Sequence, residues 1–350
     1  MKTYEEMAES ALKRIHRQEH IKKRRFKYAA ALTAAVLGMT SITAGAIAVF
    51  GRSSASVYYD SGAEQMLESQ GLIVSETKAA EHFEMTLDTL LADDFAYSVL
   101  LTVRPTDDAG VEFVEKQRSL PVEDRGSADI SVFAGSGEQI YGVGGGTFYV
   151  PEGSDSLVIA LWGKQDYEFR QKAPDGKLTV KISGSSIRLG DSFTSSNILS
   201  GLSFEITAKK NVEARRVDTA DGTGYYISQI GFAQLGKSNK GLFYPNFIWK
   251  EGAFERLLAR IGMSREEYDR GISLGTLDEA TILMNGVHYG NGSPSFGGSG
   301  FSFSADSDMM INSEGDTVCS GERIDYYPFG CLIDLNDTEG VIIGKEKLIF

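Results

Sequence analysis

Positive charge is scarce over most of this chain. Its 350 residues include 35 Lys and Arg against 48 Asp and Glu, which gives a net charge of −13. Residues 1–27 hold nine Lys and Arg and four Asp and Glu, a charge of +5, so the remainder carries −18. An acidic surface repels phosphate backbones and anionic lipids. The sequence therefore predicts no nucleic-acid partner.

Some catalytic motifs occur in the sequence, but none lies in the structural context that its chemistry requires. Residues 231–238 match the phosphate-loop spacing, but such a loop needs a following helix, and an apolar run with Pro245 follows here. His16 and His20 would share a helix face, as zinc ligands do, but the short basic segment around them has no room for a third ligand. We predict no catalytic residues, no cofactor, no metal site and no enzymatic activity.

Long apolar runs are also missing, with one exception. Residues 28–50 contain no charged side chain and are bracketed by Lys27 and Arg52. As a helix this run would be ~34 Å long, enough to cross a hydrocarbon core of ~30 Å. The basic flank precedes the run, so we expect a cytoplasmic N-terminus and residues 51–350 outside the cell. The rival interpretation is a cleaved signal peptide, since Ala44-Gly45-Ala46 resembles a cleavage site.

Small residues recur on one face of this run, at Ala34, Gly38, Ser41 and Gly45. A face of small residues lets two helices approach closely, so one hypothesis is a homodimer through the span. The other is that an Ala-rich run produces such a stripe by chance. Under both hypotheses we expect a single-pass protein of the cell membrane with the lipid bilayer as a partner.

Residues 1–27 are predicted to form a basic amphipathic helix in the cytoplasm. Its apolar face includes Met7, Ala11, Leu12 and Ile15, at helical spacing. Such an apolar face is stable when it is buried, either against a cytoplasmic regulatory protein or against the membrane surface. The sequence leaves both open.

Cysteine is nearly absent, because Cys319 and Cys331 are the only two. They flank a short polar stretch, as the two strands of a hairpin-like excursion would. A disulfide between them can form in an oxidising compartment. Two small buried thiols are an equally ordinary outcome, and the sequence leaves both open.

Short alternating runs separated by Gly, Asp, Asn and Ser dominate after the apolar run. The clearest alternation is in 83–88, and a predicted turn at 92–94 joins it to a second predicted strand at 97–103. Many short strands of this kind favour antiparallel sandwiches over alternating α/β units. The predicted fold class is therefore mainly β.

Some 300 residues exceed what one hydrophobic core usually organises. We expect an N-terminal cytoplasmic helix and one transmembrane helix, followed by two antiparallel β-sandwich-like extracytoplasmic domains. The domain boundaries are placed at 51–190 and 191–350. A short helical insertion is predicted near 252–270, where Ser264 and Glu267 have capping-box spacing.

The predicted order along the chain is a basic helix, one span, a short helix and then the run Glu84-Met85-Thr86-Leu87-Asp88-Thr89-Leu90-Leu91-Ala92-Asp93-Asp94. This order and this run resemble those of a family of bacterial single-pass membrane proteins. Residues 226–232 are similar to a recurring strand of their ectodomains. The resemblance implies an extracytoplasmic β-domain of unknown function, of the type found in anti-sigma-factor-like regulators. It carries no catalytic residues. Residues 1–27 are far shorter than the helical domain with which such regulators wrap a sigma factor.

The function predicted from the sequence is a membrane-anchored extracytoplasmic sensor or regulator, anti-sigma-factor-like, that signals across one span. The alternative is a passive surface-anchored adhesion or ligand-binding β-module with no cytoplasmic output.

Overall fold

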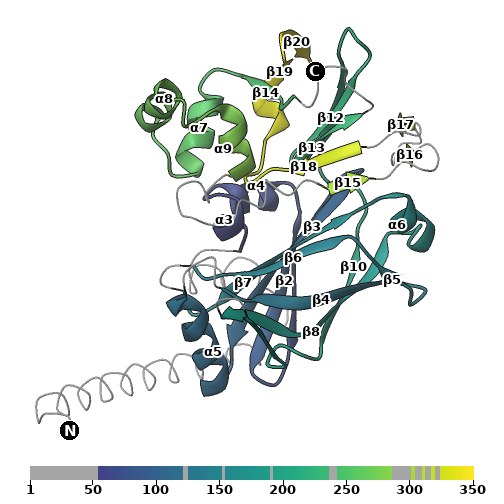
Figure 1. Ribbon diagram of the computed structural model, residues 1–350, viewed down its shortest axis with the longest axis vertical. Helices are drawn as coiled ribbons and strands as arrows, with labels where there is room; N and C mark the ends of the chain where they lie inside the picture. The colour runs from purple at the N-terminus through teal and green to yellow at the C-terminus, as the bar shows by residue number, and fades with distance from the viewer. Residues whose placement is uncertain are drawn as a thin grey trace, which may run out of the picture. The chain divides into compact units, whose positions relative to one another are not determined.

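The structure, a computed structural model, describes residues 54–120, 125–151, 154–189, 192–235, 243–285, 301–303, 310–311, 317–319 and 324–350. By their contacts, residues 52–350 form one compact unit. Most of this unit is antiparallel β structure, and seven short helices are described around it (Figure 1).

The fold class predicted from the sequence is wrong in its transmembrane helix. In the part of the chain that the structure describes, no helix is both long enough and apolar enough to cross a membrane. The segments on which that prediction rested lie outside the described residues: 1–27, with Met7, Ala11, Leu12 and Ile15, and 28–50, with Ala34, Gly38, Ser41 and Gly45. What the structure does show is a mainly β fold with several antiparallel sheets.

The largest sheet has ten strands, in the order β1-β2-β3-β7-β6-β4-β8-β10, with β5 on β4 and β9 on β8. Its strands are β1 (Ile73–Ala79), β2 (Phe83–Ala92), β3 (Ala96–Pro105), β4 (Ser127–Ala134), β5 (Gln139–Ile140), β6 (Val143–Tyr149), β7 (Leu157–Lys164), β8 (Lys177–Leu189), β9 (Ser192–Ser196) and β10 (Leu202–Thr207). The predicted domain boundary at 190/191 falls between β8 and β9, which pair with each other.

This sheet curls until its two ends meet. Lys78 on the end strand β1 donates from Nζ to the carbonyl oxygen of Ser203 on the other end strand, β10, at 2.8 Å. The same ammonium lies over the ring of Phe204, 5.2 Å from its centroid. The concave face encloses a core to which β2, β3, β4, β7, β8 and β10 all contribute. A lysine at a strand edge also discourages pairing with other chains.

The central strand β7 is buried on both faces, which explains its almost unbroken apolar sequence. Leu157, Ile159 and Leu161 point into the core enclosed by the curled sheet. The alternate residues, including Ala160 and Trp162, belong to a second core on the outer face. Side chains that are adjacent in the sequence of β7 therefore lie on opposite sides of the sheet.

Three smaller sheets complete the unit. A five-stranded sheet has the order β11-β12-β13-β18-β15, a three-stranded sheet the order β14-β19-β20, and β16 pairs with β17. These strands are β11 (Ala214–Asp218), β12 (Gly224–Ser228), β13 (Gly231–Leu235), β14 (Asn246–Trp249), β15 (Phe301–Phe303), β16 (Met310–Ile311), β17 (Thr317–Cys319), β18 (Ile324–Pro328), β19 (Thr338–Ile343) and β20 (Glu346–Ile349).

The described helices are α3 (Ser54–Tyr58), α4 (Ala63–Ser69), α5 (Asp108–Ser119), α6 (Tyr167–Lys172), α7 (Ala253–Arg260), α8 (Arg265–Ser273) and α9 (Glu279–Asn285), with a 3-10 turn, η4 (Leu335–Asp337). The predicted helical insertion is thus α7 and α8. The predicted capping box is confirmed, because the Ser264 side chain accepts from the Glu267 amide and the Glu267 side chain accepts from the Ser264 amide.

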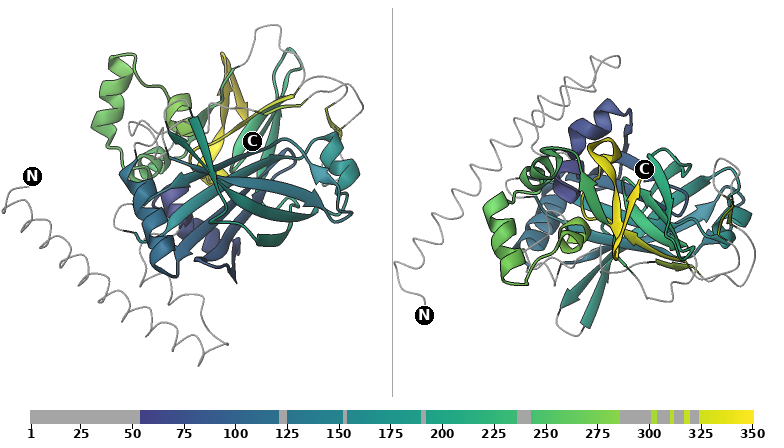
Figure 2. Two further views of the ribbon diagram at one scale, coloured as in Figure 1. Left: turned by 60° about the horizontal axis from the view of Figure 1, so that its bottom comes forward. Right: turned by 90° about the horizontal axis from the view of Figure 1, so that it is seen from above.

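The five-stranded sheet is buried on both faces. Tyr226, Ala233 and Tyr326 pack in the second core, against the outer face of the ten-stranded sheet. The opposite face, which includes Ile227 and Phe232, packs in a third core against α7, α9 and the three-stranded sheet. Figure 2 shows this succession, with α7 to α9 and β14, β19 and β20 gathered on the far side of the five-stranded sheet.

The two large sheets are joined by the turn between β2 and β3, which confirms the turn predicted at 92–94. Asp93 is buried, and its Oδ1 accepts from the amides of Phe95 and Ala96 at 2.7 and 2.8 Å. Its Oδ2 accepts from the hydroxyls of Ser228 and Tyr326, at 2.6 and 2.7 Å, across the second core. One carboxylate thus bonds two strands of the five-stranded sheet to the ten-stranded one.

We expect Asp93→Ala to lower the free energy of unfolding by about 3–4 kcal/mol, because four buried donors lose their acceptor. Urea unfolding monitored by circular dichroism measures this loss. The exposed Asp269→Ala is the matched control and should change stability by less than about 0.5 kcal/mol. Equal effects of the two substitutions would show that the carboxylate of Asp93 does not hold the sheets together.

Candidate functional site

The ten-stranded sheet opens at one place, between β4 and β6. These strands pair only at Ser127 and Thr147. Further along, β5 takes the place of β6 beside β4 and pairs with Val132 and Phe133. Between these two points, β4 and β6 separate and leave an opening that leads toward the inner core.

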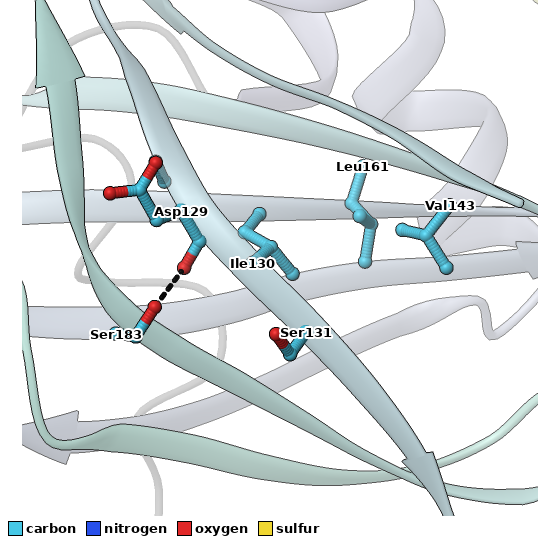
Figure 3. A pocket seen from close by; sticks show the side chains of 7 residues that line it. Asp129, Ile130, Ser131, Val143, Leu161 and Ser183 are labelled. Atoms are coloured by element: carbon cyan, nitrogen blue, oxygen red, sulfur yellow. Dashed lines mark hydrogen bonds between the residues drawn. The ribbon is translucent and has the colours of Figure 1, made fainter. Parts of the chain in front are cut away.

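A pocket of about 270 Å³ fills this opening (Figure 3). Asp129 and Ser183 lie at one end in this view, and Leu161 and Val143 lie at the other, with Ile130 between them. The complete lining is Ala128, Asp129, Ile130, Ser131, Val143, Leu161 and Ser183. This volume lies just below the usual range for small-molecule sites, so the pocket suits a small ligand or one side chain of a larger one.

Glycine explains why β6 can border the pocket closely. Gly144 and Gly145 pair with Trp162 and Leu161 of β7, and no side chain projects from them. Gly146 has a φ of +88°, and a Cβ atom there would lie 2.7 Å from the carbonyl oxygen of Ala128. Glycine in a strand often marks a place where a ligand or another backbone approaches closely. The glycines therefore let β6 lie close to β4, and Val143 is the residue of this strand that lines the pocket.

The polar groups of the pocket come from β4 and β8. Ser183 donates from Oγ to the carbonyl oxygen of Asp129 at 3.1 Å, and Ser186 donates to Asp129 Oδ1 at 2.7 Å. Asp129 is the one ionisable residue of the lining, which otherwise has the hydroxyls of Ser131 and Ser183. The accessible lining is mainly polar and consists of one carboxylate, hydroxyls and backbone groups, with a smaller apolar share from Ile130, Val143 and Leu161.

The buried pair Asp93 and Asp94 is the other cluster that could be mistaken for an active site. Burial raises the pKa of Asp93, and its hydrogen bonds oppose that rise. Asp94 Oδ2 accepts from Tyr226 at 2.8 Å and lies 3.0 Å from Lys210 Nζ. Both carboxylates are almost completely buried and already engaged by protein donors. Their role is to join the sheets.

Three other carboxyl groups, Asp60, Asp88 and Glu279, have raised pKa values. Burial raises the pKa of Asp88 to about 6, against the hydroxyl of Thr102, which donates to it at 2.6 Å. Burial raises the pKa of Glu279 to about 7. Glu279 Oε1 accepts from the amide of Phe247 at 2.6 Å and from the indole of Trp249 at 3.2 Å. A pKa near 7 suits a general base, but these donors place Glu279 at the joint between α9 and β14.

The cysteines and histidines do not assemble a site among the residues described. Cys331 is a buried free thiol in the third core, and its Sγ lies 3.8 Å from the carbonyl oxygen of Leu283. The side chain of Cys319 lies outside the described part of the chain, so the bridge between the two cysteines stays a prediction. His82 Nδ1 lies 2.7 Å from Asp107, the N-cap of α5, and this hydrogen bond raises the pKa of His82. The described residues contain no cluster of His, Cys, Asp and Glu able to hold a metal ion.

Sequence reasoning missed the pocket. The glycines 142–146 carried a signal, but the sequence shows only that a strand, and no helix, follows them. A glycine-rich strand could have indicated close approach by a ligand. The lining residues come from β4, β6, β7 and β8, and the sequence does not reveal which strands are neighbours.

The pKa of Glu279 predicts a pH-dependent stability. The folded state holds its proton up to about pH 7, whereas the unfolded state releases it near pH 4.5, so stability falls as the pH rises between these values. We expect a difference of about 2–3 kcal/mol between pH 5 and pH 8 from this group. In Glu279→Gln, urea unfolding should lose that difference, whereas the exposed Glu266→Gln should keep it. An unchanged pH dependence in Glu279→Gln would contradict the assignment.

Comparisons with known proteins add little to this geometry. No family model matches the chain, and no curated protein matches it. Among solved structures, it has a weak likeness to "the conserved domain protein from Bacillus anthracis", with a TM-score of 0.27 and 11% identity. The match covers 46% of this chain and 53% of that one, so the chain spans about half the length of that protein. A likeness this weak carries no argument, and the resemblance to anti-sigma-factor-like regulators stays a prediction.

Proposed function

We propose that residues 52–350 form the recognition part of a sensor or regulator, which binds a ligand in the pocket between β4 and β6 and performs no catalysis. The site supports this proposal by its composition. Its accessible lining is mainly polar, with a carboxylate, hydroxyls and backbone groups beside a smaller apolar part. Small-molecule recognition sites use a few placed polar groups of this kind to orient a ligand.

One observation carries the proposal, namely that β7 joins the pocket to the N-terminal end of the described unit. Leu161 lines the pocket on one face of the sheet. Its neighbour Trp162 lies on the other face and donates from its indole nitrogen to the hydroxyl of Tyr58, at 2.6 Å. A ligand that displaces Leu161 would also act on Trp162, because both side chains share one stretch of backbone.

The segment that receives this contact, α3 with the two residues after it, is held firmly. Tyr58 and Tyr59 are buried, and the hydroxyl of Tyr59 donates to Ser98 on β3 at 2.8 Å. Asp60 is buried and pairs with Arg260 of α7, with 3.2 Å between Oδ1 and Nε. Because the Trp162–Tyr58 hydrogen bond joins β7 to α3, a change at Trp162 would act on α3, the first helix of the described unit. That route is what a sensor needs and a passive module does not.

The test uses Trp162 as a reporter. The chain has two tryptophans, so Trp249→Phe leaves Trp162 alone. Trp162 is 2% exposed and should be poorly quenched by acrylamide. In this background we expect Ser131→Phe, which places a ring in the pocket, to increase acrylamide quenching because β7 is displaced and the contact between Trp162 and Tyr58 loosens.

Ser136→Phe is the matched control, since Ser136 lies in the exposed turn after the same strand. It should leave the quenching unchanged. Circular dichroism confirms that each variant is folded. If both phenylalanines leave quenching at its original level, the pocket does not act on α3, and the sensor proposal gives way to a passive binding module.

A further inference from the structure

We infer that a site for a small carboxylate lies where the end of α5 meets the start of β4, at Gln117, Arg118 and Arg125. This site is separate from the pocket between β4 and β6, and it does not depend on the function proposed for that pocket. Three observations carry the inference: two buried donors without an acceptor, two neighbouring guanidinium groups, and one positive charge that no described side chain balances.

Two donors at this place are buried and lack an acceptor. Gln117 is 0% exposed, and its Oε1 accepts from the amide of Gly126 at 2.9 Å. That hydrogen bond fixes which end of the carboxamide is the NH2 group, and this Nε2 has no hydrogen-bond partner among the described residues. The Nε of Arg125, the residue before Gly126, is likewise buried and without a partner there. Because such donors are strongly unfavourable, the pair indicates a place where an acceptor from outside the chain binds.

The charges around these donors are unbalanced. Arg118 is paired, because its Nη1 lies 2.7 Å from Glu115 Oε1 and its Nη2 donates to the carbonyl oxygen of Ser154. Within the described chain, Arg125 makes neither a hydrogen bond nor an ion pair. Burial, and then the charge of Arg118, lower the pKa of Arg125. A guanidinium nonetheless keeps its proton in proteins, so one positive charge stands without a counter-charge.

The ligand that these groups fit is a single carboxylate. A guanidinium matches a carboxylate in shape and charge, because its planar fork donates two parallel hydrogen bonds. Arg125 keeps part of its surface in solvent, so a ligand can reach it from outside. One unpaired positive charge balances one negative charge. A doubly charged anion such as sulfate fits less well, because the carboxyl end of α5 carries a partial negative charge of its own.

The experiment is thermal unfolding of the full-length chain in sodium acetate and in sodium chloride, at neutral pH and equal ionic strength. Acetate should raise the melting temperature relative to chloride by about 2–3 °C more in the native chain than in Arg125→Gln, because a ligand that binds only the folded state stabilises it. Gln117→Glu, which keeps an acceptor for Gly126 and supplies a carboxylate from the chain itself, should lose the extra stabilisation as well. The exposed Arg270→Gln is the matched control and should keep it.

Sodium sulfate separates a carboxylate site from a general anion site. Its exclusion from protein surfaces should stabilise the native chain and Arg125→Gln equally. An acetate effect of the same size in the native chain and in Arg125→Gln would overturn the inference. A sulfate effect that Arg125→Gln reduces as much as the acetate effect would overturn the assignment to a carboxylate.

The melting temperature in chloride alone is a second readout of the same site. We expect Arg125→Gln to melt no lower than the native chain there, because the substitution removes an unpaired cation that lies beside another one. A clearly lower melting temperature would show that Arg125 already has a stabilising partner within the chain, which would contradict the site.

Discussion

The carboxylate of Asp93 is the interaction on which the rest of the described structure depends. It lies in the apolar layer between the two large sheets, where an unpaired charge would be strongly destabilising. Two amides of its own turn and the hydroxyls of Ser228 and Tyr326 satisfy both of its oxygens. Beside it, Asp94 bonds Tyr226 and Lys210 in the same layer. The sheets can therefore stack in one relative position, since another position would leave these groups unpaired.

That stacking gives the ten-stranded sheet two different environments. Its inner face packs on itself as the sheet curls, and its outer face packs on the five-stranded sheet and α3. Strand β7 lies between these environments, with Leu161 on one side and Trp162 on the other. The pocket opens where β4 leaves β6, next to this strand. The pocket and the contact between Trp162 and Tyr58 thus share strand β7, so a displacement of β7 at the pocket would also move Trp162.

Local features of this fold could be predicted from the sequence. The alternation in 83–88, the strand at 97–103, the turn at 92–94 and the capping box at Ser264 each depend on a few neighbouring residues, and the structure contains all of them. Long-range features could not be predicted. The pocket arises from the order of β4, β6, β7 and β8. The free thiol of Cys331 follows from packing against Leu283, which lies far from it in the sequence.

Hydrogen–deuterium exchange of the full-length chain tests the central claim most directly, because it reports on α3 without any assumed ligand. The comparison is between the native chain and Val143→Phe, which fills the apolar end of the pocket. The account predicts faster exchange in Ser54–Tyr58 and unchanged exchange in the remote strand β20. Unchanged exchange in Ser54–Tyr58, with β6 and β7 themselves perturbed, would contradict coupling between the pocket and α3.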